Sequence, residues 1–166
     1  MIIFGIDPGL AIVGWGVIEY KGSRFRTLAH GAIQTPAHTP IETRLTQIHK
    51  ELSALLTMYN PDAVAVEELF FTNNITTGIA VAEARGVILL TAAEKGVKIF
   101  EYTPMQVKQS VVGYGKATKA QVMHMVQAIL ALQNVPKLDD TCDALAIAIC
   151  HAHTGGSRLK DFYNIK

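Results

Sequence analysis

The sequence predicts one α/β domain built on a five-stranded mixed sheet that is flanked by helices. Three observations support this fold class. The chain has 166 residues, which is enough for one hydrophobic core. Apolar residues make up 49% of the chain and charged residues 17%, a balance that disordered chains do not have. Short apolar runs of strand type alternate with segments of helical periodicity, in the order βββαβαβααα, and this alternation is typical of α/β domains.

The N-terminal part of the chain predicts an antiparallel meander of three strands. Residues 1–6 form an almost continuous apolar run, as expected for a strand covered on both faces, and the Asp-Pro-Gly turn at residues 7–9 ends it. Residues 12–20 and 25–34 are rich in β-branched and aromatic residues, and a Lys-Gly-Ser turn separates them. We therefore expect these strands to pair as successive neighbours.

The rest of the chain alternates between helices and short strands. Residues 41–59 have apolar positions at helical spacing, and the preceding Thr-Pro-Ile-Glu sequence predicts a helix start with Thr39 as N-cap. Strands are expected at residues 63–66 and 97–102, and helical crossovers predict that both run parallel to the first strand. The other helices are expected at residues 75–95, 104–112, 119–132 and 140–153.

The composition also bears on the compartment. The apolar runs are far shorter than the ~20 residues of a membrane helix, and the apolar N-terminus has no cationic leader. Cys142 and Cys150 lie eight residues apart in one expected helix, too far for a disulfide there. We therefore expect a cytoplasmic protein without membrane contact, with one domain over residues 1–153 and a polar tail over residues 154–166.

Several carboxylates fall at one edge of the expected sheet. Ligands of open α/β sheets collect outside the carboxyl ends of the parallel strands, where Asp7, Glu67 and Glu101 stand. Asp140 and Asp143 share one face of the first turn of the last helix, because they are three residues apart. Taken singly, each acid also suits a turn, a solvated strand end or a helix start.

The combination of acids favours metal-dependent chemistry on a phosphodiester. Clustered carboxylates at neutral pH need protons or cations among them, and Mg²⁺ prefers oxygen ligands. Two divalent ions about 4 Å apart are a common device for phosphodiester displacement. Residues 102–138 contain Lys108, Lys116, Lys119 and Lys137 but no acid. These lysines form either a solvated face or a surface for a phosphate backbone.

Six segments taken together resemble one family. They are residues 5–9 with 14–16, 65–70, 84–86, 101–104 with 106–109, 111–115 and 140–146. The Asp-Pro-Gly and Asp-x-x-Asp sequences alone occur in many RNase H-like and ATPase folds, whereas the whole set with Gln-Val-Lys-Gln is specific. From residue 2 to about residue 153, the chain resembles the RuvC Holliday-junction resolvases of bacteria, within the RNase H-like nucleases.

The resemblance implies a set of functional residues. The expected catalytic and metal-binding residues are Asp7, Glu67, Asp140 and Asp143. The expected DNA-binding residues are Lys108, Lys119 and Phe70, the last of which matches an aromatic residue thought to engage bases at the junction. The implied cofactor is Mg²⁺, two ions in each active site, with Mn²⁺ as a substitute. Glu68 is excluded because it takes the other strand face, and Glu101 stays outside the quartet as a supporting candidate.

Small residues along one helix predict a subunit contact. Gly78, Ala82 and Gly86 recur every four residues within residues 75–95, so another helix can approach closely. The stripe could instead pack on the chain's own sheet, but the resemblance favours a homodimer, whose symmetry suits two matched cuts. The resemblance also implies a branch-migration helicase complex of the RuvA and RuvB type as partner.

The glycines of the second expected strand have two interpretations. Gly14 and Gly16 lie on the same strand face, where they either weaken the strand or leave space. We expect them to leave room for a nucleic-acid strand beside Asp7.

The sequence thus predicts an endonuclease that resolves four-way DNA junctions by metal-dependent nicking of opposed strands, leaving 5′-phosphate ends, in recombination and repair. An RNase H-like enzyme that processes RNA would share the acids without needing the dimer. A junction-binding protein without catalysis would not need the complete quartet. Actin-like ATPases and sugar kinases share the Asp-Pro-Gly strand but need two related lobes, whereas this chain is long enough for one.

Overall fold

The computed structural model describes residues 1–68, 75–134, 136 and 138–155, without the side chains of residues 75–77. In this part of the chain five strands form one sheet in the order β3-β2-β1-β4-β5. The strands are β1 (Ile2–Asp7), β2 (Ile12–Lys21), β3 (Arg24–Gln34), β4 (Ala63–Glu67) and β5 (Lys98–Tyr102). The predicted five-stranded mixed sheet is confirmed.

The pairing of the strands brings three C-terminal ends to one edge of the sheet. β2 pairs antiparallel with both β1 and β3, as the predicted meander requires. β4 pairs parallel to β1, and β5 pairs parallel to β4. Asp7 ends β1 opposite Gly14 of β2, and Glu67 ends β4 opposite Tyr102 of β5.

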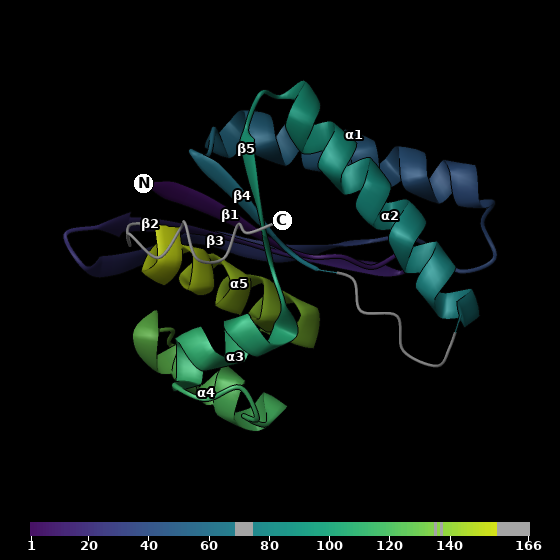
Figure 1. Ribbon diagram of the computed structural model, residues 1–166. Coiled ribbons are helices and arrows are strands. Elements are labelled where there is room, and N and C mark those ends of the chain that lie inside the picture. The colour runs from purple at the N-terminus through teal and green to yellow at the C-terminus, as the bar shows by residue number, and fades with distance from the viewer. Residues whose placement is uncertain (69–74, 135, 137, 156–166) are drawn as a thin grey trace, which may run out of the picture.

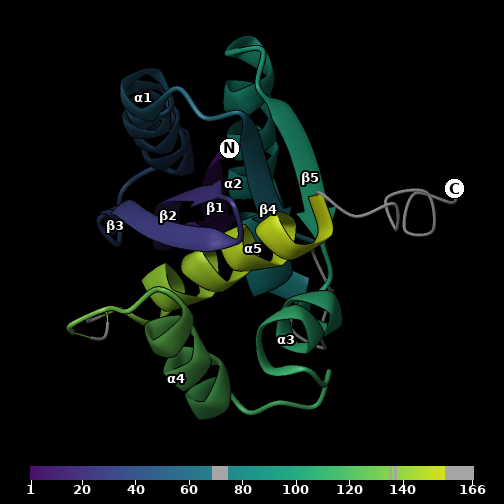
Figure 2. The ribbon, with the colours of Figure 1, turned by 90° about the vertical axis from the view of Figure 1, so that its left-hand side faces the viewer.

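Helices cover both faces of the sheet (Figure 1). One face carries α1 (Ile41–Tyr59) and α2 (Ile75–Glu94), and the other carries α5 (Asp139–Gly155). Beyond α5 lie α3 (Pro104–Val112) and α4 (Lys119–Ile129), as the turned view in Figure 2 also shows. Each face has its own buried apolar cluster, so the sheet is covered on both sides.

The two-residue period of a strand decides which face each side chain takes. On β1, Phe4 and Ile6 join the cluster under α1 and α2, whereas Ile3 joins the cluster under α5. Asp7 has the same parity as Ile3 and therefore faces α5. On β4, Ala65 lies in the α5 cluster, so Glu67 also faces α5.

The predicted start of the first helix is wrong in detail. Pro40, and not Thr39, takes the N-cap position of α1, with φ −51° and ψ 141°, and no side chain there makes a capping hydrogen bond. The ring of Pro40 fixes φ near this value. Its carbonyl oxygen accepts the N–H groups of Thr43 at 3.1 Å and Arg44 at 3.2 Å, which starts the helix without a side-chain cap.

Other helix ends agree with the predictions within a few residues. Capping boxes at Thr103 and Thr118 start α3 and α4. α4 ends at Ile129, before the predicted residue 132, and Ala131 has a left-handed φ of 48°. α5 extends to Gly155, so it includes the first residues of the predicted tail at 154–166, whose remaining residues lie outside the described part of the chain.

Glycines of the first two strands make room for α5, and the prediction that they make room for nucleic acid is wrong. A Cβ atom at Gly14 would collide with the carbonyl oxygen of Asp140, and one at Gly16 would collide with the side chain of Leu145. On β1, a Cβ atom at Gly5 would collide with the carbonyl oxygen of Ala144. The space that the missing side chains leave is already filled by the backbone and side chains of α5.

Neither cysteine of the chain carries a reactive thiolate. Cys142 and Cys150 are buried free thiols on α5, and burial raises the pKa of Cys142 to about 11 and that of Cys150 to about 12. Both thiols therefore stay protonated at neutral pH.

Within the described residues, no helix combines the length and the apolar character that a membrane crossing requires.

Candidate active site

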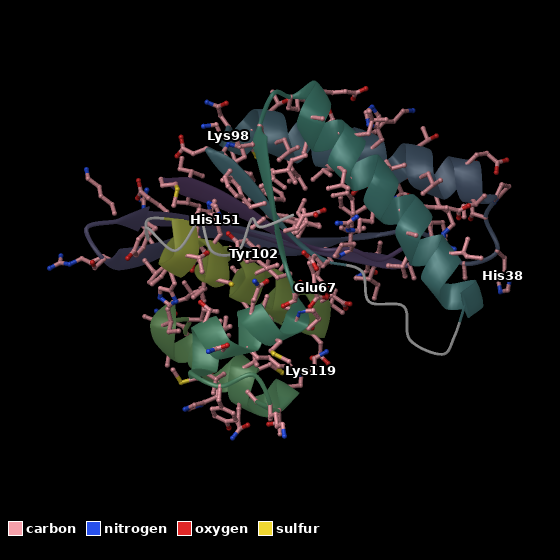
Figure 3. The ribbon with its side chains drawn as sticks, viewed as in Figure 1. His38, Glu67, Lys98, Tyr102, Lys119 and His151 are labelled. Atoms are coloured by element: carbon pink, nitrogen blue, oxygen red, sulfur yellow. The ribbon has the colours of Figure 1, made fainter. Side chains whose placement is uncertain are left out.

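Four carboxylates that the sequence predicted as catalytic come together beside the N-terminal end of α5. Asp7 and Glu67 end the paired parallel strands β1 and β4 and face α5. Asp140 and Asp143 lie in the first turns of α5. This helix lies close to the sheet because the glycines of β2 have no side chains that would collide with it. These four carboxylates are named the acidic edge below. Figure 3 labels Glu67 in this region.

Burial and mutual repulsion raise the pKa of carboxyl groups in the acidic edge. Burial, followed by repulsion from Glu67, Asp143 and Asp140, raises the pKa of Asp7 to about 8. Burial also raises the pKa of Glu67 and that of Asp143, and the nearby charges of Lys108 and Lys119, respectively, oppose these shifts. In the absence of added cations, the edge therefore keeps a proton on Asp7 at neutral pH.

The two lysines predicted to bind DNA border the acidic edge. Lys119 Nζ lies 3.3 Å from Oδ2 of Asp143 and 3.3 Å from Oδ2 of Asp139. The Lys119 side chain is 52% exposed, so its ammonium group remains open to an approaching anion. It is the first residue of α4 after the Thr118 cap, and Figure 3 shows it toward the N-terminal end of α5. Lys108, on α3, lies near enough to Glu67 for its positive charge to lower the pKa of that carboxyl group.

The donor set of the acidic edge fits a hard divalent cation. Its four carboxylates supply only oxygen ligands, and a cation among them would relieve the repulsion that raises the pKa of Asp7. In the described part of the chain, however, no three His, Cys, Asp or Glu side chains are arranged to hold one ion. The ammonium group of Lys119 neutralises Asp143 instead. A cation bound here would compete with Lys119 for this carboxylate.

Glu101 stands at the same edge of the sheet but on its other face. Ile99, two residues earlier on β5, packs in the cluster under α1 and α2, and Glu101 shares that parity. Its carboxylate forms an ion pair with Arg85 of α2. The Nε–H of Arg85 also donates to the carbonyl oxygen of Glu67 at 3.3 Å. Glu101 therefore contacts a group that touches the backbone of the acidic edge.

Sequence reasoning did not single out Arg85. It appeared only within the Ala-Arg-Gly segment at residues 84–86. The signal that could have found it is that Arg85 is the one basic residue in the sequence of α2, which is otherwise mostly apolar. A lone cation in such a helix needs an acidic partner.

The small-residue stripe consists of Gly78, Ala82 and Gly86. At Gly86 it does not pack against the chain's own sheet. The inward side of α2 consists of the fully buried Ala84, Ile88 and Ala92. Gly86 is exposed, and a Cβ atom there would meet no atom within 4 Å. Ile79 is 53% exposed and Leu90 57% exposed along the same helix. The outer side of α2 is therefore apolar at Ile79, Gly86 and Leu90, with the exposed Glu83 among them.

One predicted DNA contact and one lysine of the basic segment over residues 102–138 lie outside the described residues. Phe70 falls within residues 69–74, and Lys137 also falls outside the described ranges. Lys116 is exposed in the connection between α3 and α4.

The order and directions of the five strands, with helices on both faces, define an RNase H-like protein, and four carboxylates gather at one edge of its sheet. Residues 3–151 match the family model for RuvC, described as crossover junction endodeoxyribonuclease. The chain therefore belongs to the RuvC family, whose members depend on a divalent metal ion.

Curated relatives and solved structures agree with this assignment. The chain is 58% identical to the crossover junction endodeoxyribonuclease RuvC of Alkaliphilus oremlandii over 166 residues, which is 100% of each chain. It is 56% identical to the Clostridioides difficile protein of the same name, covering 93% of this chain and 91% of the relative. The Thermus thermophilus RuvC structure superposes with a TM-score of 0.86 at 40% identity, covering 93% of this chain and 95% of that chain. A structure of T. thermophilus RuvC in complex with Holliday junction substrate has the same TM-score at 36% identity and the same coverage.

The raised pKa of Asp7 predicts how stability depends on pH. Without divalent ions, the unfolded chain loses this proton near pH 3.8, whereas the folded chain keeps it up to about pH 8. The folded state thus binds more protons across this window, and the free energy of unfolding falls as pH rises. We expect Asp7→Asn to melt at least about 3 °C above wild type at pH 8 in EDTA, with the gap closing toward pH 4.

Thermal melts in EDTA between pH 4 and pH 8 measure this effect. Glu68→Gln is the matched control, because Glu68 lies beyond the end of β4 and outside the acidic edge. Parallel curves for wild type and Asp7→Asn would contradict the proposed proton on Asp7.

Proposed function

We propose that this chain is a structure-specific endonuclease that resolves four-way DNA junctions by nicking two opposed strands. The observation that carries the proposal is the acidic edge beside Lys108 and Lys119, in a chain of the RuvC family. The similar curated proteins are named crossover junction endodeoxyribonucleases, and a similar T. thermophilus protein was solved with Holliday junction substrate.

Asp7, Glu67, Asp140 and Asp143 would hold the metal, which we propose to be two Mg²⁺ ions per site, with Mn²⁺ as a substitute. Bound divalent ions supply positive charge to the scissile phosphate and make water a stronger nucleophile. Asp7 would give up its proton when the site holds a metal, because its raised pKa of about 8 reflects burial and repulsion from the neighbouring carboxylates. Asp143, which pairs with Lys119 in the metal-free chain, would then pair with the bound metal as well.

The ammonium groups of Lys119 and Lys108 would hold the DNA backbone, and that of Lys119 is open to an anion even before a metal binds, because its side chain is 52% exposed. Both lysines come from helices that lie on the α5 side of the sheet, next to Asp143 and Glu67. In the hydrolysis, a water oxygen bonds to phosphorus while the bond from phosphorus to the 3′ oxygen breaks. The products are a 5′-phosphate and a 3′-hydroxyl.

A homodimer through the small-residue stripe is part of the proposal. The outer side of α2 is apolar and exposed at Ile79 and Leu90, and Gly86 leaves space for a neighbouring helix. A two-fold pair would present two acidic edges, which suits two matched cuts. Action within the cytoplasm, the extent of the domain over residues 1–153, and a branch-migration helicase complex of the RuvA and RuvB type as partner belong to the same proposal.

Cleavage assays with the acidic-edge variants test the proposed activity. Wild type should cut a synthetic four-way junction in Mg²⁺, spare linear duplex and RNA–DNA hybrid, and stop in EDTA. Asp7→Asn, Glu67→Gln and Asp143→Asn should bind the junction but cut it slower by a factor of about 100 or more, because each removes a metal-binding charge.

The control for this series is Glu68→Gln, which should cut like wild type. Preferred cutting of the RNA–DNA hybrid would favour the RNA-processing alternative. Junction binding by wild type without any metal-dependent cutting would favour a non-catalytic protein. Full activity of Glu67→Gln with loss in Glu68→Gln would reverse the assignment of strand faces.

The lysines should be separable from the acids by the salt dependence of binding. Lys108→Ala and Lys119→Ala should each weaken junction binding in EDTA and flatten the slope of log affinity against log salt by about one, since each removes one phosphate contact. Lys50→Ala is the control, because Lys50 is exposed on α1 across the sheet. Unchanged affinity and slope in both variants would return these lysines to a solvated face.

Ala82→Arg should separate the proposed dimer. A long cation in the small-residue stripe prevents close approach of two α2 helices. Sedimentation should then show a monomer with an unchanged circular dichroism spectrum. Linear product from a cruciform plasmid, which needs paired nicks, should fall much more than singly nicked product.

Ala54→Arg, on the exposed surface of α1, is the matched control for this change. An Ala82→Arg variant that stays dimeric and resolves junctions normally would refute the interface. An unfolded variant would mean that Ala82 packs within its own protomer.

A further inference from the structure

Arg85 occupies a particular place beneath the acidic edge. It projects from α2, on the face of the sheet opposite α5, and its side chain is only 16% exposed. Its guanidinium group reaches the C-terminal ends of two neighbouring strands. Nη2 pairs with the carboxylate of Glu101 on β5, and Nε donates to the carbonyl oxygen of Glu67 on β4 at 3.3 Å.

The contact to Glu67 is to its backbone, so it leaves the carboxylate free. The side chain of Glu67 faces α5 and the acidic edge, while Arg85 approaches the same residue from the α2 side. β4 has five residues and ends at Glu67, where the ladder to β5 closes with the N–H of Glu68 donating to the carbonyl of Tyr102 at 2.9 Å. The orientation of a residue at a strand end depends on the further hydrogen bonds of its backbone. Here the hydrogen bond from Arg85 to the Glu67 carbonyl oxygen is such a contact.

The ion pair with Glu101 in turn fixes the guanidinium group. A largely buried arginine requires an acidic partner, and a planar guanidinium holds two acceptors in a defined relative direction. Glu101 is 41% exposed, so this pair contributes little to stability by itself. Its effect is geometric, because it keeps Nε directed at the Glu67 carbonyl.

We propose that Arg85, oriented by Glu101, is a positioning residue that holds the Glu67 carboxylate in register with the other carboxylates of the acidic edge. The inference rests on the proposed function, since it assigns Glu67 to the metal-binding set. Groups that orient metal ligands without touching the ion typically change metal affinity or activity by about 10-fold to 100-fold when they are removed. Arg85 lies on the face of the sheet away from α5, Lys108 and Lys119, so it acts through the protein and not on the DNA.

The test uses Arg85→Ala, Arg85→Lys and Glu101→Gln in the full chain. Arg85→Ala should raise the Mg²⁺ concentration for half-maximal junction cleavage by about 10-fold and lower kcat. Junction affinity in EDTA should stay at the wild-type value. Arg85→Lys, which keeps one charged donor, should recover part of the loss. Glu101→Gln should shift the Mg²⁺ requirement in the same direction, and the double variant should be no worse than Arg85→Ala.

A second readout does not depend on the substrate. Mg²⁺ that binds the folded acidic edge raises the melting temperature, and in Arg85→Ala this rise should require a higher Mg²⁺ concentration. Arg26→Ala is the control for loss of an Arg–Glu ion pair away from the acidic edge, because the more exposed Arg26 pairs with Glu19 at 3.0 Å on β2 and β3. It should change neither readout. If wild type fails to cut junctions but shows the Mg²⁺ effect on melting, the proposed function fails while the role of Arg85 remains testable.

Two results would overturn the role of Arg85. An unchanged Mg²⁺ requirement in both cleavage and melting would remove it. A loss of junction affinity in EDTA equal to the loss of activity would make Arg85 a DNA contact. Should Arg85→Ala fail to fold, Arg85→Lys and Glu101→Gln decide the same question, since both keep a polar group in place.

Discussion

The acidic edge depends on how closely α5 lies against β1 and β2. Glycine at positions 5, 14 and 16 removes the side chains that would collide with Ala144, Asp140 and Leu145 of α5. The backbone of the helix therefore lies almost directly on the strands. This contact brings acids from the end of the sequence to within interaction distance of Asp7, near its beginning.

Electrostatics then determines what the assembled edge can do. Desolvation and repulsion raise the pKa of three of its carboxyl groups, and Lys119 offsets part of this by pairing with Asp143. The same lysine is exposed enough to meet an anion. The folded chain thus holds a cluster of carboxylates with too little positive charge next to a lysine that is open to a phosphate. A divalent metal ion would neutralise the carboxylates, and a nucleic-acid backbone would pair with the lysine.

Much of this arrangement could be predicted from the sequence, because it follows from local patterns. Parallel connections placed Asp7 and Glu67 at one edge, whereas Glu101 was left out of the quartet on the family resemblance, and the structure adds that it lies on the other face of the sheet. The individual contacts that hold the distant elements together could not be predicted. The reason for Gly14 is the backbone of α5, and the partner of Arg85 is 16 residues away on a different element. The Thr39 cap failed because Pro40 starts α1 by itself.

The glycine contacts also have a consequence for how DNA is selected. A helix that lies on strand backbone cannot slide or turn without collision, so the carboxylates at its first turns keep a fixed spacing. When a phosphate is fitted to that spacing, the nucleic acid must therefore deform, because the site does not. Uniform duplex is stiff, with a persistence length of about 150 base pairs, so bending it to fit costs energy that differs from one DNA to another. A rigid site of this kind discriminates by the compliance of the DNA, even where it reads none of the bases.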